Sequence, residues 1–518
     1  MPSANQPLLQ KLLLKARSGV RSLPHLAFLP ASTASKRLCI VISDIHCTDG
    51  TVGNQSGEGE DWLFFFQQVE QAAQGQQELV FVLNGDIIDL IRSAIWTEAG
   101  VYPWERDHPR FVELIDKIMG GIIDQHARPS GLFGVDGFFE LLRQLKARLK
   151  NAGVTMKVIP IVGNHDKELL LVSHARKRFY LECLDWDTEQ DAEYTQWITA
   201  MYGRATPGEA PWLPFYFGDR GFQLFATHGQ WRDSSNSVPT GGWKVGKWHP
   251  AHWKALHFAP FTDACFGDTV AAGLLSGFIW DAKNALHLQE AANRTDSKAI
   301  SRLCSILDEM DLYRPATKGI VRILQEARAQ RSKGTDEHIL RAISTNFRNN
   351  LRRWLSHGTT WQRAPFPIIV FLPILWILSR LREEIVSLGV MKLMAWVQEP
   401  KSGIALKDLI SLAGFHAAYR EYGFSIHTEG HTHVALEADL QFDTPPQRPN
   451  YSYINTGAWR GQIFPKANYG YRRRSIGRAL YLYEQTGEDG NDKLCYYVRD
   501  SLNWGTHLDN LSKSKCMK

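Results

Sequence analysis

The stretch Val158-Ile159-Pro160-Ile161-Val162-Gly163-Asn164-His165-Asp166 organises the chain. A short apolar run ends at a glycine turn, and three side chains that can bind metal or transfer protons follow at once. Apolar runs of this length, bounded by a turn, are typical of buried strands. In α/β sheets, chemistry collects beyond the carboxyl ends of such strands. The stretch therefore predicts an α/β fold with a functional site at a sheet edge.

Four further stretches repeat this design, because each places Asp, His or both after a run that favours a strand. The runs cover residues 37–43, 78–84, 222–227 and 423–427. They lead into Asp44-x-His46, Gly85-Asp86-x-x-Asp89, His228-Gly229 and Gly430-His431-x-His433. One such match would be only a hypothesis. All five in order predict that five strand ends meet at one site for two metal ions.

The residue types in these motifs suit divalent transition metals. Mixed histidine and carboxylate ligation favours Mn, Fe, Zn or Co over Mg or Ca alone. A carboxylate has two oxygens and can bridge two ions about 3.5–4 Å apart. Asp44 and His46 stand two residues apart, so an extended chain would point both side chains the same way. Asp89 is predicted to cap the following helix rather than to bind metal.

The motifs also divide the chain into regions. Residues 37–233 and 423–500 carry all five motifs and form the predicted catalytic domain. Residues 234–422 separate the fourth motif from the fifth and are rich in helix formers, which predicts a mostly helical cap insertion. Residues 1–36 are a basic N-terminal extension, and residues 501–518 are a C-terminal tail. Helices are expected at 62–73, 111–125 and 136–151, and a closing hairpin at 479–484 and 494–499.

The composition is that of a globular protein, with 44% hydrophobic and 22% charged residues among 518. A net charge of +5 is small for this length and gives no support for a nucleic-acid partner. The seven cysteines form no CxxC pair and have no regular spacing, which favours a reducing compartment. We therefore expect a cytoplasmic protein.

Two stretches point to contact with a membrane surface. The first acidic residue is Asp44, and Lys11 and Lys15 interrupt the leucine-rich start, so a secretory signal fits poorly. A basic amphipathic helix on an anionic membrane, an organelle transit peptide and a loosely docked tail all stay open. Residues 366–378 are the most apolar stretch but are shorter than the roughly 20 residues of a spanning helix. We favour packing of that stretch within the cap over a membrane surface or acyl pocket, and expect peripheral membrane association of the whole protein.

The motifs resemble those of the calcineurin-like metallophosphoesterase superfamily over roughly residues 37–233 and 423–460. Gly85–Leu90, Gly430–His433 and Asn455–Trp459 are most similar to its UDP-diacylglucosamine pyrophosphatase-like branch. The resemblance implies a four-layer αββα sandwich, here with a large, mostly helical insertion. Gln230 stands where that branch often has an acidic residue, and the insertion exceeds the size that is usual in the branch. We therefore do not infer the substrate of that branch for this chain. Leu90-Ile91 replaces the Arg-Gly of protein Ser/Thr phosphatases, which argues against that activity.

The resemblance also implies roles for the site residues. One metal ion would be bound by Asp44, His46 and His433, the other by Asn164, His228 and His431, and Asp86 would bridge both. A metal-bridging hydroxide would attack phosphorus. His165 would contact the phosphate and protonate the leaving oxygen, and Asp166 would hold its ring. The cofactors would be two divalent transition-metal ions, Mn²⁺ first, with Fe, Zn or Co as alternatives.

The sequence thus predicts a metal-dependent phosphoesterase that hydrolyses a phosphomonoester, phosphodiester or pyrophosphate bond. Its substrate would be a small phosphorylated molecule, such as a lipid or nucleotide conjugate. A single-strand nuclease of the same fold would instead use basic cap residues and tryptophans, but no long basic stripe is visible. A non-catalytic metal-binding scaffold is the other alternative, and the intact ligand set argues against it. A cluster within residues 234–260 could line a substrate pocket or pack in a core: Trp243, Trp248, His249, His252 and Trp253.

Overall fold

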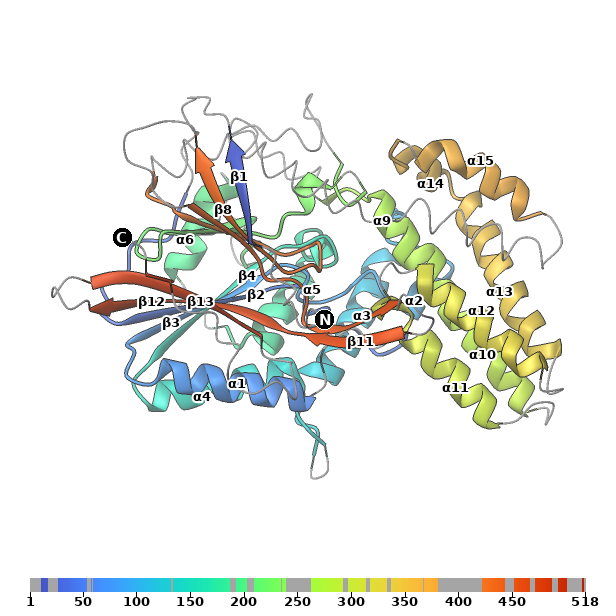
Figure 1. Cartoon of the computed structure of the whole chain (residues 1–518), viewed down its shortest axis with the longest axis horizontal. Helices are drawn as coiled ribbons and strands as arrows, with labels where there is room; N and C mark the ends of the chain where they lie inside the picture. The colour runs from blue at the N-terminus through green and yellow to red at the C-terminus, as the bar shows by residue number, and fades with distance from the viewer. Residues whose placement is uncertain are drawn as a thin grey trace, which may run out of the picture.

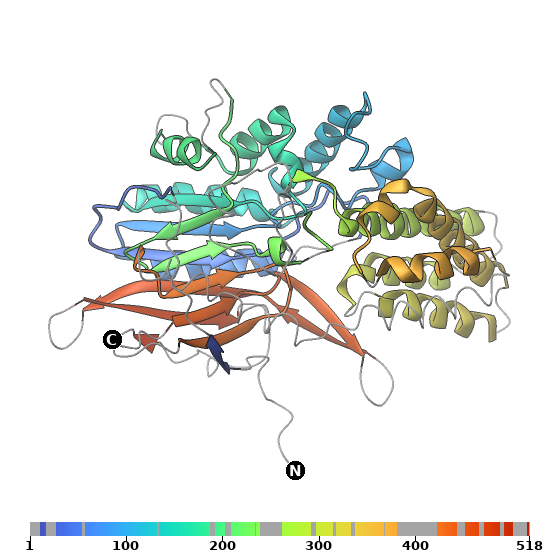
Figure 2. The same cartoon turned by 90° about the horizontal axis from the view of Figure 1, so that it is seen from above.

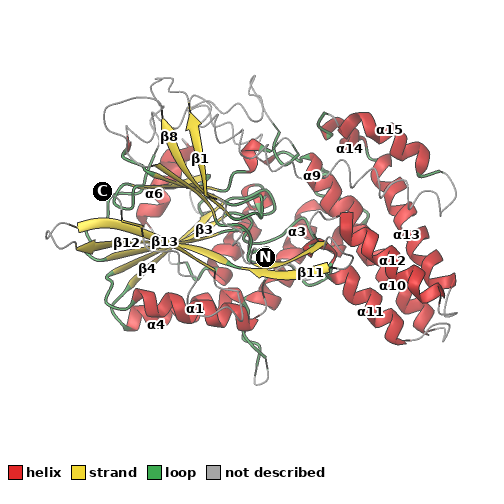
Figure 3. Ribbon diagram, viewed as in Figure 1, coloured by secondary structure: helices red, strands yellow, loops and turns green. Residues whose placement is uncertain are grey.

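The computed structural model places two sheets and a group of helices in one chain (Figures 1 and 3). It describes residues 11–16, 27–53, 57, 59–131, 134–186, 192–202, 209–233, 235–238, 262–291, 297–313, 317–332, 337–366, 368–380, 422–442, 451–465, 471–486, 492–500 and 515–516. Both large sheets have six strands and mix parallel with antiparallel pairs. The predicted α/β class is confirmed.

The first sheet has the strand order β14-β13-β12-β2-β3-β4. Its parallel half consists of β2 (Arg37–Ile42), β3 (Glu78–Asn84) and β4 (Thr155–Ile161). Every residue of β2 and β3 is buried, which explains why their sequences are apolar without alternation. The antiparallel half consists of β12 (Arg478–Thr486), β13 (Asp492–Asp500) and β14 (Lys515–Cys516). The pair β12–β13 is the predicted closing hairpin.

The second sheet has the order β1-β8-β9-β7-β6-β5. Its strands are β1 (Lys11–Ala16), β8 (Leu436–Phe442), β9 (Tyr451–Asn455), β7 (Ile426–Glu429), β6 (Leu224–Thr227) and β5 (Tyr216–Asp219). Because β1 pairs with β8, an amphipathic helix is wrong for Lys11–Ala16. Strands β10 (Arg460–Pro465) and β11 (Tyr471–Ile476) form a separate antiparallel ribbon.

Helices α1 (Gly59–Ala73) and α4 (Phe138–Asn151) lie side by side along the first sheet (Figure 1). Aromatic contacts hold α1 there: the rings of Phe65 and Phe81 are 6.2 Å apart, and Trp62 stacks on Trp459 at 4.7 Å. Buried side chains from both sheets belong to one apolar core. The other helices near this core are α2 (Ala94–Ala99), α3 (Phe111–His126), α5 (Ser173–Arg178) and α6 (Ala192–Tyr202), with short turns η1 (Lys167–Leu170), η2 (Phe179–Cys183) and η3 (Gln230–Arg232).

The remaining helices gather to one side of the sheets (Figures 1 and 2). They are α9 (Phe266–Asp268), η4 (Thr269–Ser276), α10 (Gly277–Ala291), α11 (Ser297–Asp308), η5 (Met310–Leu312), α12 (Thr317–Ser332), α13 (Glu337–Ser356), α14 (Gly358–Arg363) and α15 (Ile368–Leu378). They enclose an apolar core of their own, around Phe278, Leu303 and Phe347. All fall within the range predicted as a helical insertion, and we call them the helical region. Trp243, Trp248, His249, His252 and Trp253 lie outside the described residues.

The described helices do not include one that is both long enough and apolar enough to cross a bilayer. Cys495 is in a disulfide bond, which the spacing of the cysteines does not predict. Cys39, Cys47, Cys183, Cys265 and Cys304 are free and buried. Burial raises the pKa of the Cys47 thiol, as expected for a packed side chain rather than a metal-binding thiolate.

Candidate metal centre

Strand topology brings the five motifs to one place. Three motifs follow β2, β3 and β4, which are parallel neighbours in the first sheet. The other two follow β6 and β7, which are parallel neighbours in the second sheet. The Asn84 side chain donates from Nδ2 to the carbonyl of Thr227 at 3.1 Å and so ties the two sheet edges together. The seven predicted ligand residues therefore converge, although they come from two sheets.

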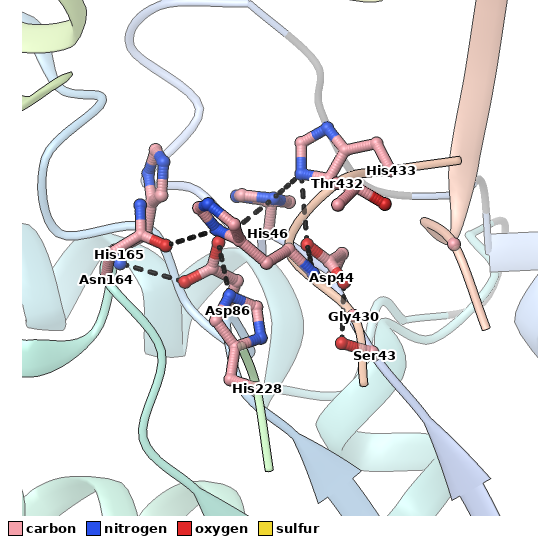
Figure 4. A network of polar contacts seen from close by, with 12 residues as sticks. Ser43, Asp44, His46, Asp86, Asn164, His165, His228, Gly430, Thr432 and His433 are labelled. Carbon is pink, nitrogen blue, oxygen red and sulfur yellow. Dashed lines mark hydrogen bonds and ion pairs between the residues drawn. The ribbon is translucent and has the colours of Figure 1, made fainter. Parts of the chain in front are cut away.

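A first cluster consists of Asp44, His46, Asp86 and His433, whose ligand atoms all lie within 4.8 Å of one another (Figure 4). His433 Nε2 is 3.0 Å from Asp44 Oδ1 and 3.2 Å from His46 Nε2. His46 Nε2 is 3.7 Å from Asp86 Oδ2. Two carboxylates and two imidazoles in this arrangement can hold one divalent ion.

A second cluster consists of Asp86, His228 and His431. His228 Nε2 is 3.3 Å from Asp86 Oδ2. Asn164 joins this cluster, because its Oδ1 lies 2.9 Å from Nδ1 of His431. Asp86 therefore belongs to both clusters, as the bridging position requires.

The two ring nitrogens of His228 differ in their partners, and this difference suits a metal ligand. Its Nδ1 donates to the carbonyl of Asn84 at 2.8 Å. The other nitrogen, Nε2, then carries a lone pair; it lies 3.3 Å from Asp86 Oδ2 and has no hydrogen-bond partner among the described residues. Buried polar atoms are nearly always partnered. A cation beside Asp86 would satisfy this one.

His46 gives the same indication. Its Nδ1 lies 3.1 Å from Asp89 Oδ2, which makes Nδ1 the protonated nitrogen. Its Nε2 lone pair then faces Nε2 of His433 at 3.2 Å. The lone pairs of two ring nitrogens at that distance repel each other unless a proton or a metal ion lies between them. The residues present therefore fit the predicted ions.

The backbone at the site is strained. Five of the seven non-glycine residues with positive φ in the described chain are predicted ligands: Asp44, His46, Asp86, His431 and His433, with φ between 49° and 64°. Such conformations cost about 1–3 kcal/mol each and cluster at functional sites. The chain is therefore not extended from Asp44 to His46, so residue spacing alone does not set the direction of these two side chains. Both side chains reach the cluster from left-handed turns.

Three motif glycines leave the room that the ligands occupy. A Cβ atom on Gly85 would overlap the ring of His228, and one on Gly163 would overlap the carboxylate of Asp86. A Cβ on Gly430 would overlap Ser43 and the Asp44 carboxylate. These positions require glycine because the ligands pack directly on the backbone.

Asp89 holds His165. Its Oδ1 lies 2.8 Å from His165 Nδ1, while its Oδ2 contacts His46. Asp89 does not cap α2, because the side chain of Ser93 accepts the N–H of Ile95 at that helix start. Asp89 instead accepts the backbone N–H of Arg92 at 2.9 Å. The predicted cap is wrong, and Asp89 is a part of the site that the sequence interpretation missed.

The Asp166 side chain contacts the backbone, whereas the sequence predicted that it holds the His165 ring. Its carboxylate accepts the backbone N–H groups of Gly163 at 2.6 Å and of Ile87 at 2.9 Å. The predicted contact between Asp166 and the His165 ring is therefore wrong. Asp166 fixes the turn that carries Asn164 and His165.

The site concentrates charge that needs compensation. Burial lowers the pKa of His165, but the carboxylates of Asp89 and Asp86 outweigh it and raise the pKa to about 9. Burial likewise lowers the pKa of His228, and Asp86 and Asp44 raise it to about 10. Burial raises the pKa of Asp86, but the rings of His228, His165 and His46 outweigh it and hold that pKa well below its usual range. The carboxylates thus favour positive charge, which protons or metal ions can supply.

Two more residues touch the ligands. Asp233 Oδ2 lies 3.1 Å from His431 Nε2, which leaves Nδ1 of that ring directed at Asn164. Arg460 Nη2 lies 2.6 Å from His433 Nδ1. Outer contacts of this kind orient metal-binding rings. The only sequence signal for either residue is its nearness to the fourth motif or to Trp459.

Buried ion pairs fix the helical region to the loops of the site. Lys167, directly after the third motif, lies 2.5 Å from Asp268 of α9. Arg92, shortly after the second motif, pairs with Asp311 of η5 and donates to Ser276 Oγ at 2.8 Å. The side chains of both pairs are at most 9% exposed. The helical region is therefore positioned by residues adjoining the ligands.

Comparison with known proteins gives no assignment. No protein-family model matches the chain, and no curated protein matches it.

Proposed function

We propose that this chain is a two-metal-dependent phosphoesterase of the calcineurin-like metallophosphoesterase superfamily. It hydrolyses a phosphomonoester, phosphodiester or pyrophosphate bond. The observation that carries the proposal is the sharing of Asp86 between two ligand clusters. A shared carboxylate is what two ions about 3.5–4 Å apart need, and that spacing is the one used in hydrolysis at phosphorus.

The fold is compatible with this assignment. Two mixed sheets share one core, and α1 and α4 cover the outer side of the first sheet. We propose that this arrangement is the αββα sandwich of the superfamily, with the helical region as its insertion. The order of the five motifs along the chain supports the same proposal.

Each ligand would have a defined part. Asp44, His46 and His433 would bind one ion, while Asn164, His228 and His431 would bind the other. The ions would be Mn²⁺, with Fe, Zn or Co as alternatives. When bound, they would polarise the phosphoryl oxygens and supply a nucleophile at neutral pH. The neutral Asn164 oxygen limits negative charge where an anionic phosphate must bind.

His165 is placed to handle a proton. Its ring lies beside the first cluster, with its centroid 4.7 Å from that of His46. Its Nδ1 lies 2.8 Å from Asp89 Oδ1 in an ion pair, so Nε2 is the atom that would give a proton to the leaving oxygen. The Asp89 carboxylate stabilises the protonated ring before the transfer. The substrate would be a small phosphorylated molecule such as a lipid or nucleotide conjugate.

Hydrolysis assays of the full chain test this function. Nitrophenyl phosphate, bis-nitrophenyl phosphate, a nucleoside diphosphate conjugate and single-stranded DNA would be offered with Mn²⁺ and with a chelator. The proposal expects ester or pyrophosphate hydrolysis that chelator abolishes, that Mn²⁺ restores and that Asp86→Asn removes. Asp124→Asn, whose side chain in α3 is 75% exposed, is the matched control and should stay active.

The other outcomes of the panel separate the alternatives. Cleavage of DNA alone would favour a nuclease. Two tightly bound ions with no turnover of any substrate would overturn the enzyme assignment and favour a metal-binding scaffold.

A further inference from the structure

Helix α15 is apolar on both of its faces. All eleven residues from Ile368 to Leu378 are apolar. One face packs inward, where Leu372 is 0% and Leu375 is 6% exposed within the core of the helical region. Packing in the cap, the interpretation favoured from the sequence, thus holds for this face alone.

The opposite face is open among the described residues. The exposed fractions there are 41% for Ile369, 53% for Val370, 45% for Ile374, 43% for Trp376 and 57% for Ile377. Phe366, just before the helix, is 83% exposed. Single exposed apolar side chains are ordinary, but a contiguous group marks a binding surface. We call these six residues the α15 patch, and Figure 1 shows α15 at the outer edge of the helical region.

The chain around the α15 patch is basic. Between Glu337 and Glu383 the sequence has no acidic residue but seven arginines: Arg341, Arg348, Arg352, Arg353, Arg363, Arg380 and Arg382. In the part of the chain that the structure describes, Arg353 pairs with Asp281 and Arg363 lies 3.6 Å from Asp263. The Arg380 guanidinium instead lies 3.2 Å from the centroid of Trp376.

Another arginine marks the end of α15. Arg352 donates from Nε to the carbonyl of Ser379 at 2.8 Å, so its guanidinium is fixed beside the last turn of the helix. Arg352 and Arg380 are both exposed. Positive charge therefore borders the apolar patch.

We propose that the α15 patch binds the surface of an anionic lipid bilayer. Apolar side chains on one face of a helix enter the boundary between headgroups and acyl chains, while arginines at its edge meet anionic headgroups. Eleven residues are too few to cross the hydrocarbon core, so α15 lies in the plane of the interface. Trp376 beneath Arg380 suits that boundary, where aromatic rings with a polar partner concentrate.

Charge favours this occupant over a second copy of the chain. A two-fold dimer through the patch would bring the same arginine border against itself. An anionic bilayer is complementary to both the apolar and the basic part. The proposal is independent of the phosphoesterase assignment, because it uses no residue of the metal centre.

Vesicle sedimentation of the full chain tests the proposal. The probes are vesicles of phosphatidylcholine alone and of phosphatidylcholine mixed with phosphatidylglycerol. The test variant carries Val370→Ser, Ile374→Ser and Ile377→Ser, all at exposed positions. The control is Leu288→Ser in α10, where the side chain is 71% exposed. We expect the wild type to bind the vesicles that contain phosphatidylglycerol more strongly than those of phosphatidylcholine alone. We also expect added salt to weaken this binding.

The affinity of the triple variant for the anionic vesicles should be lower by about tenfold or more, because the variant loses several methylene groups that insert into the bilayer. The control should bind like the wild type, and hydrolysis of a soluble substrate should be unchanged in both. Equal vesicle binding by the wild type and the triple variant, or no binding by the wild type, overturns the proposal.

Two further measurements identify any other occupant. A dimer in sedimentation velocity that the triple variant dissociates, without vesicle binding, would make the patch a self-interface. Lower thermal stability of the triple variant, again without vesicle binding, would show that the chain covers its own patch. Either result also overturns the lipid proposal.

Discussion

Oδ1 of Asp89 lies 2.8 Å from Nδ1 of His165, across two motifs that are far apart in the chain. The second oxygen of the same carboxylate lies 3.1 Å from Nδ1 of His46. One buried side chain thus holds both the proposed proton donor and a proposed metal ligand. A change at Asp89 should therefore disturb chemistry and metal binding together.

Asp89→Asn should lower kcat about 10–100-fold and weaken metal binding, because a neutral amide holds the two rings less firmly. Asp166→Asn should mainly lower the unfolding temperature, since Asp166 contacts backbone N–H groups rather than the His165 ring. Steady-state kinetics, metal analysis and thermal unfolding of both variants check this. A larger loss of kcat in Asp166→Asn than in Asp89→Asn would contradict the assignment.

Asp86→Ala should remove activity by about 10³-fold or more and reduce bound metal to one ion or fewer. The reason is that one carboxylate serves both clusters, and the metal ions supply several kcal/mol of transition-state stabilisation. Metal analysis of the purified variant decides the point, with Asp124→Ala as an exposed control. Two retained ions would exclude Asp86 as the bridge.

His165→Ala should keep both ions, because His165 is not needed by either proposed ligand set. Its kcat should fall about 10²–10⁴-fold on alkyl phosphates, whose alkoxide needs a proton to leave. Nitrophenyl phosphates should be affected much less, since nitrophenolate leaves without one. The measurement is kcat across a leaving-group series, together with metal analysis. Equal losses for all leaving groups would leave His165 with a binding role only.

Asp268→Asn should destabilise the fold by about 3–5 kcal/mol, because it leaves Lys167 charged, buried and unpaired. The double change Lys167→Met with Asp268→Leu should recover much of this loss, since apolar pairs replace buried ion pairs well. Denaturant unfolding measures both. Glu113→Gln, which breaks an exposed pair with Arg110, should cost less than about 1 kcal/mol. A double variant no more stable than Asp268→Asn would contradict the pairing.

Glu78 should stabilise the fold at neutral pH and not in acid. Its carboxylate lies 2.7 Å from Arg37 Nε and 2.9 Å from Lys157 Nζ. Burial raises the pKa of Glu78, but the two cations outweigh it, and the pKa falls below its ordinary 4.5. A lowered folded-state pKa gives stability that is present above 4.5 and lost as pH falls through the folded value.

Glu78→Gln should therefore destabilise the protein by about 1–3 kcal/mol near pH 7. The difference from wild type should be smaller at about pH 3, because the carboxylate begins to take up a proton as the pH falls below 4.5. Urea unfolding of both proteins at the two pH values is the measurement. A difference that is constant or larger in acid would show that Glu78 is protonated in the folded state.

Strands β2 and β3 could be predicted from the sequence because their apolar runs are uninterrupted. Buried on both faces, β2 and β3 tolerate no polar residue between their ends. The polar residues therefore begin where the strands stop, which marks the ligands directly. Lys11–Ala16 shows the limit of such local patterns: its alternatives included a helix, and pairing with β8 makes it a strand.

Contacts around the ligands could not be predicted in the same way. The positive φ angles of Asp44 and His46 redirect their side chains, and residue spacing carries no information about such turns. Asp233 and Arg460 gave no motif of their own, although both touch ligand histidines.

The sequence by itself determined the α/β class, the positions of the five strands that precede the motifs and of the closing hairpin, and which side chains stand at those strand ends, because strand burial and side-chain chemistry are local properties. Tertiary structure alone decided that Asp89 rather than Asp166 holds His165, that Lys167 pairs with Asp268, and that one face of α15 is open. These outcomes depend on how distant segments pack and on the direction of each turn. A linear pattern of residue types does not specify either.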